Sequence, residues 1–204
     1  MSQTDGDLLR VIPDVDQPSM GWAHLGDGRW RCALGRSGVA DNKVEGDGLT
    51  PAGEYPLRRL LYRADRLALP RTGLRGRPIG PHDGWCDDPE SPSYNRWVRI
   101  PNEWRCEQLW REDGLYDLVV PIGYNDDPPE GEWGSAIFLH IAKDDYSPTQ
   151  GCVAFKREDL LELVTLIGPG TKINVHSIPA NETAPKASGD EDMKQFEDFD
   201  EQDW

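Results

Sequence analysis

Two stretches decide how this chain folds: Ser135-Ala-Ile-Phe-Leu-His140 and Ser147-Pro-Thr-Gln-Gly-Cys152-Val-Ala-Phe155. A free thiol has a pKa of about 8.5, so little thiolate forms at neutral pH without a nearby base or positive charge. The first stretch is an apolar strand that can bring His140 to Cys152. Gly151 leaves the backbone unobstructed, so that main-chain N–H groups can point at a carbonyl under attack. The pair predicts a catalytic cysteine with its base, and the alternative is that both are ordinary core residues.

The composition favours one loop-rich β domain. A chain of 204 residues with 37% hydrophobic residues, 8 Trp and 6 Tyr can form one packed core. The 21 Gly and 17 Pro favour short strands joined by turns over a helical bundle. A Gly26-Asp27-Gly28 turn between apolar runs at 20–25 and 29–35 predicts a hairpin.

Further elements follow from the hydrophobic pattern. Strands are expected over residues 54–62, 96–101, 116–124, 135–142 and 171–177. An amphipathic helix is expected over 156–167, because Leu160, Leu161, Val164 and Ile167 share one face, and Gly168-Pro169-Gly170 ends it. Residues 70–93 have little periodicity, which predicts a binding loop or a disordered insertion, and 102–113 are expected to be a short helical or irregular piece.

The charge is unevenly distributed. Of the net −15, the segment 179–204 carries nine acidic residues and two lysines. This acidic balance speaks against nucleic-acid binding, which needs a basic footprint. The segment is predicted to be disordered by its composition. Its Phe196, Phe199 and Trp204 can form a protein-docking motif, although a solvating tail is the simpler interpretation.

The cysteines give no sign of a metal site. Cys32, Cys86, Cys106 and Cys152 form no CxxC pair and no His/Cys zinc spacing, so we expect neither a metal nor a cofactor. A single disulfide among the first three remains open. The N-terminal residues lack the apolar core of a secretory signal, and no stretch approaches the ~20 apolar residues of a membrane helix. We therefore expect a soluble monomer without a transmembrane segment.

Several pieces together resemble the L,D-transpeptidase (YkuD) catalytic domain, in a divergent branch of that family. They are Thr50-Pro-Ala-Gly-Glu-Tyr-Pro56, the strand ending at His140, the turn before Cys152, and the final helix and strand. The resemblance covers about residues 20–178. It implies a mainly β fold, a β-sandwich or barrel-like domain with one helix after the catalytic cysteine and irregular loops. We divide the chain into a lead-in at 1–18, the catalytic domain at 19–178 and the acidic tail at 179–204.

The sequence also departs from the usual family pattern. That pattern has Gly after the histidine, and Ser/Thr-His-Gly-Cys followed two places later by Arg or Asn. In this chain Ile141 follows the histidine, Gln150 replaces the second histidine, and Ala154 replaces the Arg or Asn. The gap to the cysteine is also short. A segment Asp83-Gly-Trp-Cys-Asp-Asp-Pro89 precedes the site, as in the divergent branch. These changes preserve the fold and the nucleophile and leave donor and acceptor specificity open.

The resemblance implies that the substrate is a peptidoglycan stem peptide. Cys152, deprotonated by His140, would attack the carbonyl of an L-centre and form a thioester. The side-chain amine of a diaminopimelate on another stem would then make a cross-link, or water would release a trimmed stem. Whether the third or the first stem residue is attacked stays open.

Further site residues are expected around this pair. The backbone N–H groups of Gln150, Gly151 and Cys152 are candidates for the oxyanion hole, and a backbone carbonyl is expected to orient His140. Ser147 and Thr149 are expected to shape the turn, with substrate contact as the alternative. A polar and aromatic cluster is expected to contribute to the substrate groove: Trp85, Asp87, Asp88, Tyr94, Asn95 and Arg96. Within it, an arginine suits a stem carboxylate.

Other functions remain open at this point. The same scaffold supports an L,D-carboxypeptidase or a hydrolase of stems or stem-linked proteins. A non-catalytic wall-binding or tail-docking module and a cytosolic thiol enzyme are further alternatives. The family substrate implies the periplasm or cell envelope, while the lack of a visible signal keeps a cytoplasmic location as the alternative.

Overall fold

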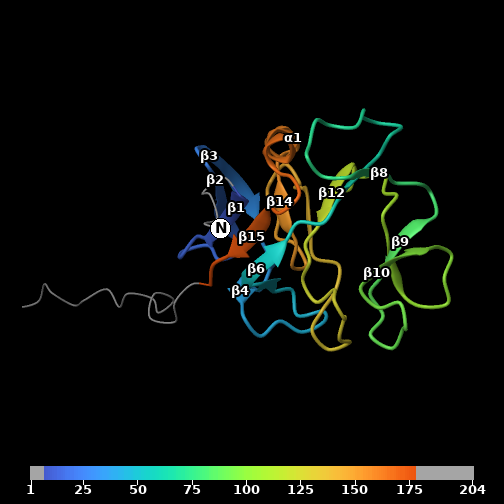
Figure 1. Ribbon diagram of the computed structural model, residues 1–204. Coiled ribbons are helices and arrows are strands. Elements are labelled where there is room, and N and C mark those ends of the chain that lie inside the picture. The colour runs from blue at the N-terminus through green and yellow to red at the C-terminus, as the bar shows by residue number, and fades with distance from the viewer. Residues whose placement is uncertain (1–6, 178–204) are drawn as a thin grey trace, which may run out of the picture.

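The computed structural model describes residues 7–177 of the protein. Its body is a curled ten-stranded sheet in the order β6-β15-β1-β2-β3-β14-β13-β12-β7-β8 (Figure 1). The strands of this sheet are β1 (Leu8–Pro13), β2 (Met20–Leu25), β3 (Gly28–Ala33), β6 (Gly53–Pro56), β7 (Leu60–Tyr62), β8 (Gly76–Pro78), β12 (Leu118–Pro121), β13 (Phe138–Ile141), β14 (Val153–Phe155) and β15 (Lys172–Val175). Together with a single described helix, α1 (Arg157–Leu166), they confirm the predicted mainly β fold class.

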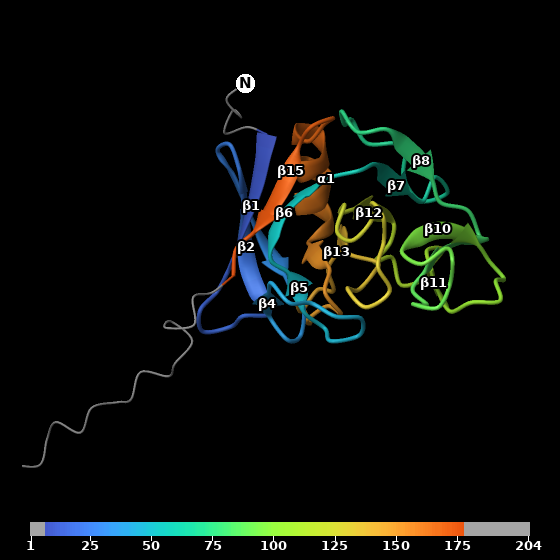
Figure 2. The same cartoon turned by 60° about the horizontal axis from the view of Figure 1, so that its bottom comes forward.

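Two small sheets complete the described part. An antiparallel three-stranded sheet has the order β10-β9-β11, and a parallel pair joins β4 to β5. Their bounds are β4 (Val39–Ala40), β5 (Thr50–Pro51), β9 (Asp83–Cys86), β10 (Arg96–Arg99) and β11 (Cys106–Gln108). Figure 2 shows β10 and β11 at the end of the molecule away from β1 and β15.

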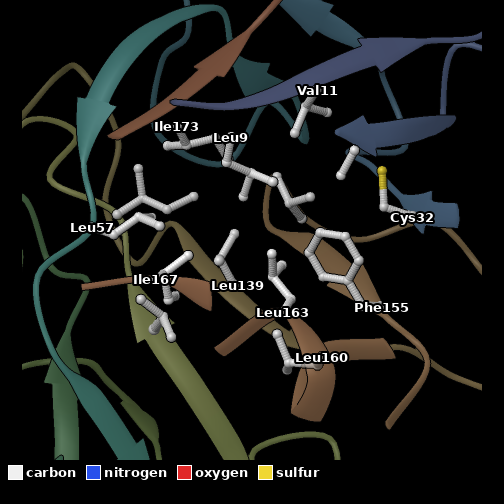
Figure 3. Packing of buried hydrophobic residues seen from close by; sticks show 14 of the residues in the cluster. Leu9, Val11, Cys32, Leu57, Leu139, Phe155, Leu160, Leu163, Ile167 and Ile173 are labelled. Atoms are coloured by element: carbon white, nitrogen blue, oxygen red, sulfur yellow. The ribbon is translucent and has the colours of Figure 1, made fainter. Parts of the chain in front are cut away.

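The main core lies between the inner face of the large sheet and α1. Leu160, Leu163 and Val164 of α1 are fully buried and pack in one cluster with Leu9 and Phe155 (Figure 3). The predicted helix is confirmed. It ends where residue 167 turns to an extended conformation ahead of the Gly-Pro-Gly stop.

The central strands β12, β13 and β14 are buried on both faces. Along β13, Leu139 belongs to the main core, whereas Phe138 belongs to a second cluster. In the same way, Val153 of β14 belongs to the main core, whereas Cys152, just before this strand, belongs to the second cluster. Because side chains alternate along a strand, one face of these strands supports α1 and the other is available for a site.

Three segments differ from the sequence prediction. β1, which lies within residues 1–18, pairs with both β2 and β15 inside the large sheet. The single strand expected over 54–62 is two strands, because the chain leaves β15 after Pro56 and joins β12 and β8 from Leu60. The segments 70–93 and 102–113 contain β8, β9 and β11. These strands are short and depend on partners distant in sequence, so local periodicity does not predict them.

Several features bear on the remaining expectations. All four cysteines are free thiols, so no disulfide joins Cys32, Cys86 and Cys106. Within residues 7–177, no helix has the length and apolar character needed to cross a membrane. The predicted acidic tail at 179–204 lies outside the described residues.

Candidate active site

The pairing of β13 with β14 brings His140 and Cys152 to the same face. The strands are parallel, with Leu139 opposite Val153 and His140 opposite Ala154, so Cys152 lies beside Phe138 just before β14 begins. By alternation, Phe138, His140 and Cys152 project away from the α1 core. His140 and Cys152 line one cavity of about 730 Å³. The fold therefore places both side chains on one cavity.

The sulfur of Cys152 is held between a donor and an acceptor. Its S–H donates to the carbonyl oxygen of Ala136 at 3.2 Å, and the N–H of Phe138 donates to the sulfur at 3.4 Å. Burial raises the pKa of the Cys152 thiol to about 12, and the negative charge of Glu107 adds to this effect. The Phe138 N–H and Lys43 act in the opposite direction. The resting side chain is thus a protonated thiol.

His140 is held as a neutral imidazole. Its Nδ1 lies 2.8 Å from the carbonyl oxygen of Ile141. A carbonyl only accepts, so Nδ1 carries the proton and Nε2 keeps a lone pair. The ring of Tyr116 packs edge-on at 5.2 Å between centroids. Burial lowers the pKa of His140 to about 4. The backbone carbonyl expected to orient the histidine is that of Ile141.

The turn before the cysteine is fixed by its own side chains. The Thr149 hydroxyl donates to the Cys152 carbonyl at 2.7 Å and accepts from the Gly151 N–H at 3.1 Å. Ser147 donates to Asp145 through both its N–H and its hydroxyl. Ser147 and Thr149 therefore shape the turn as expected, and with Gln150 they also line the cavity.

Gly151 is required for a different reason from the one expected. Its φ is +137°, which L side chains rarely adopt, and a Cβ there would lie 2.7 Å from the Leu49 carbonyl oxygen. The space beside the Gly151 Cα is thus occupied by the loop of residues 41–49. The glycine permits close packing of that loop against the turn.

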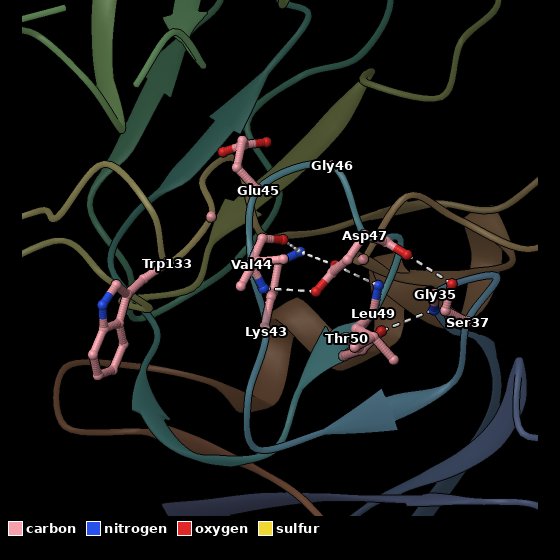
Figure 4. Close-up of polar contacts among 12 residues, drawn as sticks. Gly35, Ser37, Lys43, Val44, Glu45, Gly46, Asp47, Leu49, Thr50 and Trp133 are labelled. Atoms are coloured by element: carbon pink, nitrogen blue, oxygen red, sulfur yellow. Dashed lines mark hydrogen bonds and ion pairs between the residues drawn. The ribbon is translucent and has the colours of Figure 1, made fainter. Parts of the chain in front are cut away.

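The same loop provides a buried lysine that no sequence motif singles out. Lys43 is 5% exposed, lines the cavity and binds the Asp47 carboxylate at 2.9 Å (Figure 4). Asp47 also accepts the N–H groups of Val44 and Leu49, at 2.6 and 2.8 Å. Lys43 thereby sets a positive charge beside the cysteine. A lysine in a loop rich in Gly and Asp is usually solvated, and only tertiary packing distinguishes this one.

Acidic and basic side chains share the cavity wall. Glu45 accepts the hydroxyls of Tyr94 and Ser135, at 2.6 and 2.8 Å, and Glu107 accepts the hydroxyl of Tyr116 at 2.5 Å. Burial raises the pKa of Glu107. The charged residues lining the cavity are Lys43, Glu45, Asp87, Arg105, Glu107, Arg111 and Lys143. Such a mixed wall suits a peptide that carries both amines and carboxylates.

The cluster expected in the groove is divided between several places. Asp87 lines the cavity of Cys152, whereas Trp85, Asn95 and Arg96 line a second cavity of about 520 Å³. Tyr94 is buried against Glu45, and Asp88 accepts the N–H of Arg105. Side-chain atoms of Asn95 make four hydrogen bonds within the protein, which leaves it little capacity for a substrate.

The cavity is lined by a buried thiol and a buried neutral imidazole, and a family comparison covers the same residues. The family model described as the YkuD L,D-transpeptidase catalytic domain matches residues 14–175. The chain belongs to the YkuD family. A comparison with curated proteins found no match. Membership places this YkuD domain among transferases that act on peptidoglycan in the cell wall through a cysteine.

The YkuD match agrees with the observed end of the fold and differs at its start. It ends at residue 175, the last residue of β15, and includes both β13 and β14 with the turn between them. It begins after β1, although β1 is an internal strand of the sheet. Within residues 7–177, no three or more His, Cys, Asp or Glu side chains are grouped so as to hold a metal ion.

Proposed function

We propose that the protein is a peptidoglycan L,D-transpeptidase that forms stem-peptide cross-links through a thioester on Cys152. The observation that carries this proposal is the common cavity of Cys152 and His140, with the Nδ1 proton of His140 held by the Ile141 carbonyl. That hydrogen bond leaves Nε2 as the base. We further propose that it acts in the periplasm or cell envelope, where the family substrate lies.

In the first half-reaction, Nε2 of His140 accepts the proton of Cys152 as the sulfur bonds to the substrate carbonyl carbon. The proton must turn away from the Ala136 carbonyl, which accepts it in the resting structure. The tetrahedral intermediate then collapses, the C–N bond breaks, and His140 returns the proton to the departing amine. A thioester and a free amine result.

The second half-reaction reverses these proton transfers. An amine of a second stem attacks the thioester carbonyl, His140 takes its proton, and the Cys152 sulfur leaves and is reprotonated. The products are a new amide and the free enzyme. Water in place of the amine would give a carboxylate, which is the hydrolytic outcome.

Backbone N–H groups of the turn are proposed to stabilise the oxyanion. Gly151 is the weakest of the three candidates, because its N–H already donates to Thr149. We therefore assign the role to the N–H groups of Gln150 and Cys152. A single such donor typically contributes about 10²–10³ in rate.

The test is incubation of the purified protein with a disaccharide-tetrapeptide, followed by mass spectrometry of the products. Cross-linked dimers are expected. Cys152→Ala should abolish them, whereas Cys32→Ala, which changes a buried core thiol, should leave them intact apart from reduced stability. Shortened monomers without dimers would show that the protein catalyses hydrolysis and not transfer. Unchanged products from Cys152→Ala would overturn the nucleophile assignment.

A further inference from the structure

Two residues near the nucleophile adopt a left-handed backbone conformation without being glycine. Asn95 has φ +52° and Ala136 has φ +53°. Alanine is uncommon in this region, and such a conformation persists only where the surrounding structure enforces it. The residues enforcing it at Ala136 are therefore of interest.

Asn95 is one of them, and its side chain is fully used. It is 3% exposed. Its Oδ1 accepts the Ala136 N–H at 3.1 Å and the Trp85 indole N–H at 2.9 Å. Its Nδ2 donates to the carbonyl oxygens of Tyr124 and Asn125, at 3.0 and 2.6 Å. Asn95 thus ties the peptide N–H of Ala136 to the loop after β12.

Ala136 passes this anchoring on to the nucleophile. Its carbonyl oxygen accepts the Cys152 S–H at 3.2 Å. The other group on the sulfur, the N–H of Phe138, is fixed separately, because Phe138 pairs with Pro121 of β12. Asn95 therefore controls the acceptor of the thiol proton and leaves the donor to the sulfur in place.

We propose that Asn95 is a positioning residue for the nucleophile, which it orients by holding Ala136 so that its carbonyl oxygen binds the Cys152 thiol. The proposal rests on the proposed function of Cys152. It replaces the substrate-binding role that the sequence suggested for Asn95. Without the Asn95 side chain, Ala136 would relax and move its carbonyl away from the sulfur. The Cys152 thiol would then keep the Phe138 N–H as its donor and lose the Ala136 carbonyl as its acceptor.

Loss of that acceptor shifts the pKa of the Cys152 thiol in a direction that can be measured. A hydrogen bond accepted from the thiol stabilises the protonated form, so its removal favours the thiolate. The variant alters none of the charged and titratable side chains that line the same cavity, which are His140 on β13, Glu107 on β11, Tyr116 before β12, Lys43 and Glu45 in the loop 41–49, and Asp87, Arg105, Arg111 and Lys143. The change should therefore reflect the acceptor alone.

The experiment measures two rates on Asn95→Gly, which preserves the left-handed backbone and removes the side chain. The rate of iodoacetamide alkylation of Cys152 is followed at pH 8 by peptide mass spectrometry, without substrate. This rate should rise about three- to tenfold, which corresponds to the loss of one neutral hydrogen bond. Turnover of the disaccharide-tetrapeptide should fall about tenfold, because the sulfur is no longer oriented. Asn95→Ser serves as a second variant with the same expectation.

Asn125→Gly is the matched control. Asn125 is also left-handed, at φ +46°, and its side chain bonds Glu130 and Gly134 but not Ala136. Thermal unfolding reports the stability lost in each variant. Faster alkylation together with slower turnover, seen only in the Asn95 variants, supports the proposal. An unchanged alkylation rate, or equal effects in Asn125→Gly, overturns it. Failure of wild-type turnover together with faster alkylation of the Asn95 variants would refute the proposed function alone.

Discussion

The buried imidazole of His140 makes a quantitative prediction about stability in acid. Its pKa falls from 6.5 to about 4 through burial, while in the unfolded chain it keeps its ordinary value. Above pH 6.5 both states are neutral and nothing changes. As the pH falls from 6.5 towards 4, the unfolded chain binds a proton that the folded protein refuses, so folding is penalised increasingly.

The size of the penalty follows from the same values. Each pKa unit corresponds to about 1.36 kcal/mol, so the gap between 6.5 and about 4 amounts to about 3 kcal/mol once the pH is below both values. This is a large part of the free energy of unfolding of a typical domain, which is roughly 5–15 kcal/mol. Burial of His140 therefore keeps its imidazole neutral and lowers the stability of the protein in acid.

Urea unfolding of the wild type and of His140→Gln, at pH 7 and in steps down to pH 4.5, measures this penalty. Glutamine does not titrate and can still donate to the Ile141 carbonyl. The free energy of unfolding should fall more steeply for the wild type, with a difference of about 2–3 kcal/mol at pH 4.5. His140→Asn should behave in the same way. Parallel curves would show that His140 is solvated or charged, and the assignment of Nε2 as the base would fail with it.

Three further predictions concern the nucleophile and its surroundings. With a pKa of about 12, Cys152 should be alkylated at pH 7.5 about a thousandfold more slowly than a free thiol, and Glu107→Gln should raise the rate several-fold by removing a negative charge. Gly151→Ala should lower the free energy of unfolding by about 3 kcal/mol in thermal melts, because its Cβ meets a carbonyl oxygen at 2.7 Å and its φ is +137°. Oxidised glutathione should join Cys86 to Cys106, which face each other across β9 and β11, with loss of two hydrogens by intact mass that Cys86→Ser prevents.

The sequence predicts β13 and singles out His140 and Cys152 as a candidate pair. The unbroken apolar run before His140 predicts β13 from local pattern alone, whereas β14 (Val153–Phe155) is not among the strands that the pattern predicts. The helix after them follows from its period and from the Gly-Pro-Gly stop. The parallel register of β13 and β14, which sets the two side chains on one face, depends on tertiary pairing that the local pattern does not predict.

The rest of the site depends on contacts between distant segments. Lys43 and Glu107 reach the cavity from the loop 41–49 and from β11. Neither segment has a hydrophobic periodicity from which its position beside the cavity can be predicted. Asn95 looked like a ligand for substrate because it is polar and lies in an irregular region. Its partners at residues 124, 125 and 136 are invisible until the chain folds. The hydrophobic pattern predicts which residues lie on a strand, whereas tertiary contacts determine the role of a residue in a loop.

The resting state of Cys152 and His140 has a consequence for the proposed mechanism. A thiol with a raised pKa and an imidazole with a lowered one do not form an ion pair on their own, so in this mechanism the thiol stays protonated until a substrate arrives. Oxidants and electrophiles react with the thiolate, and a cysteine held as a thiol is protected from them. A substrate that excludes water and places its carbonyl beside the turn N–H groups offers the developing negative charge a better site than the sulfur. Proton transfer to His140 then becomes favourable only in the presence of the group to be attacked.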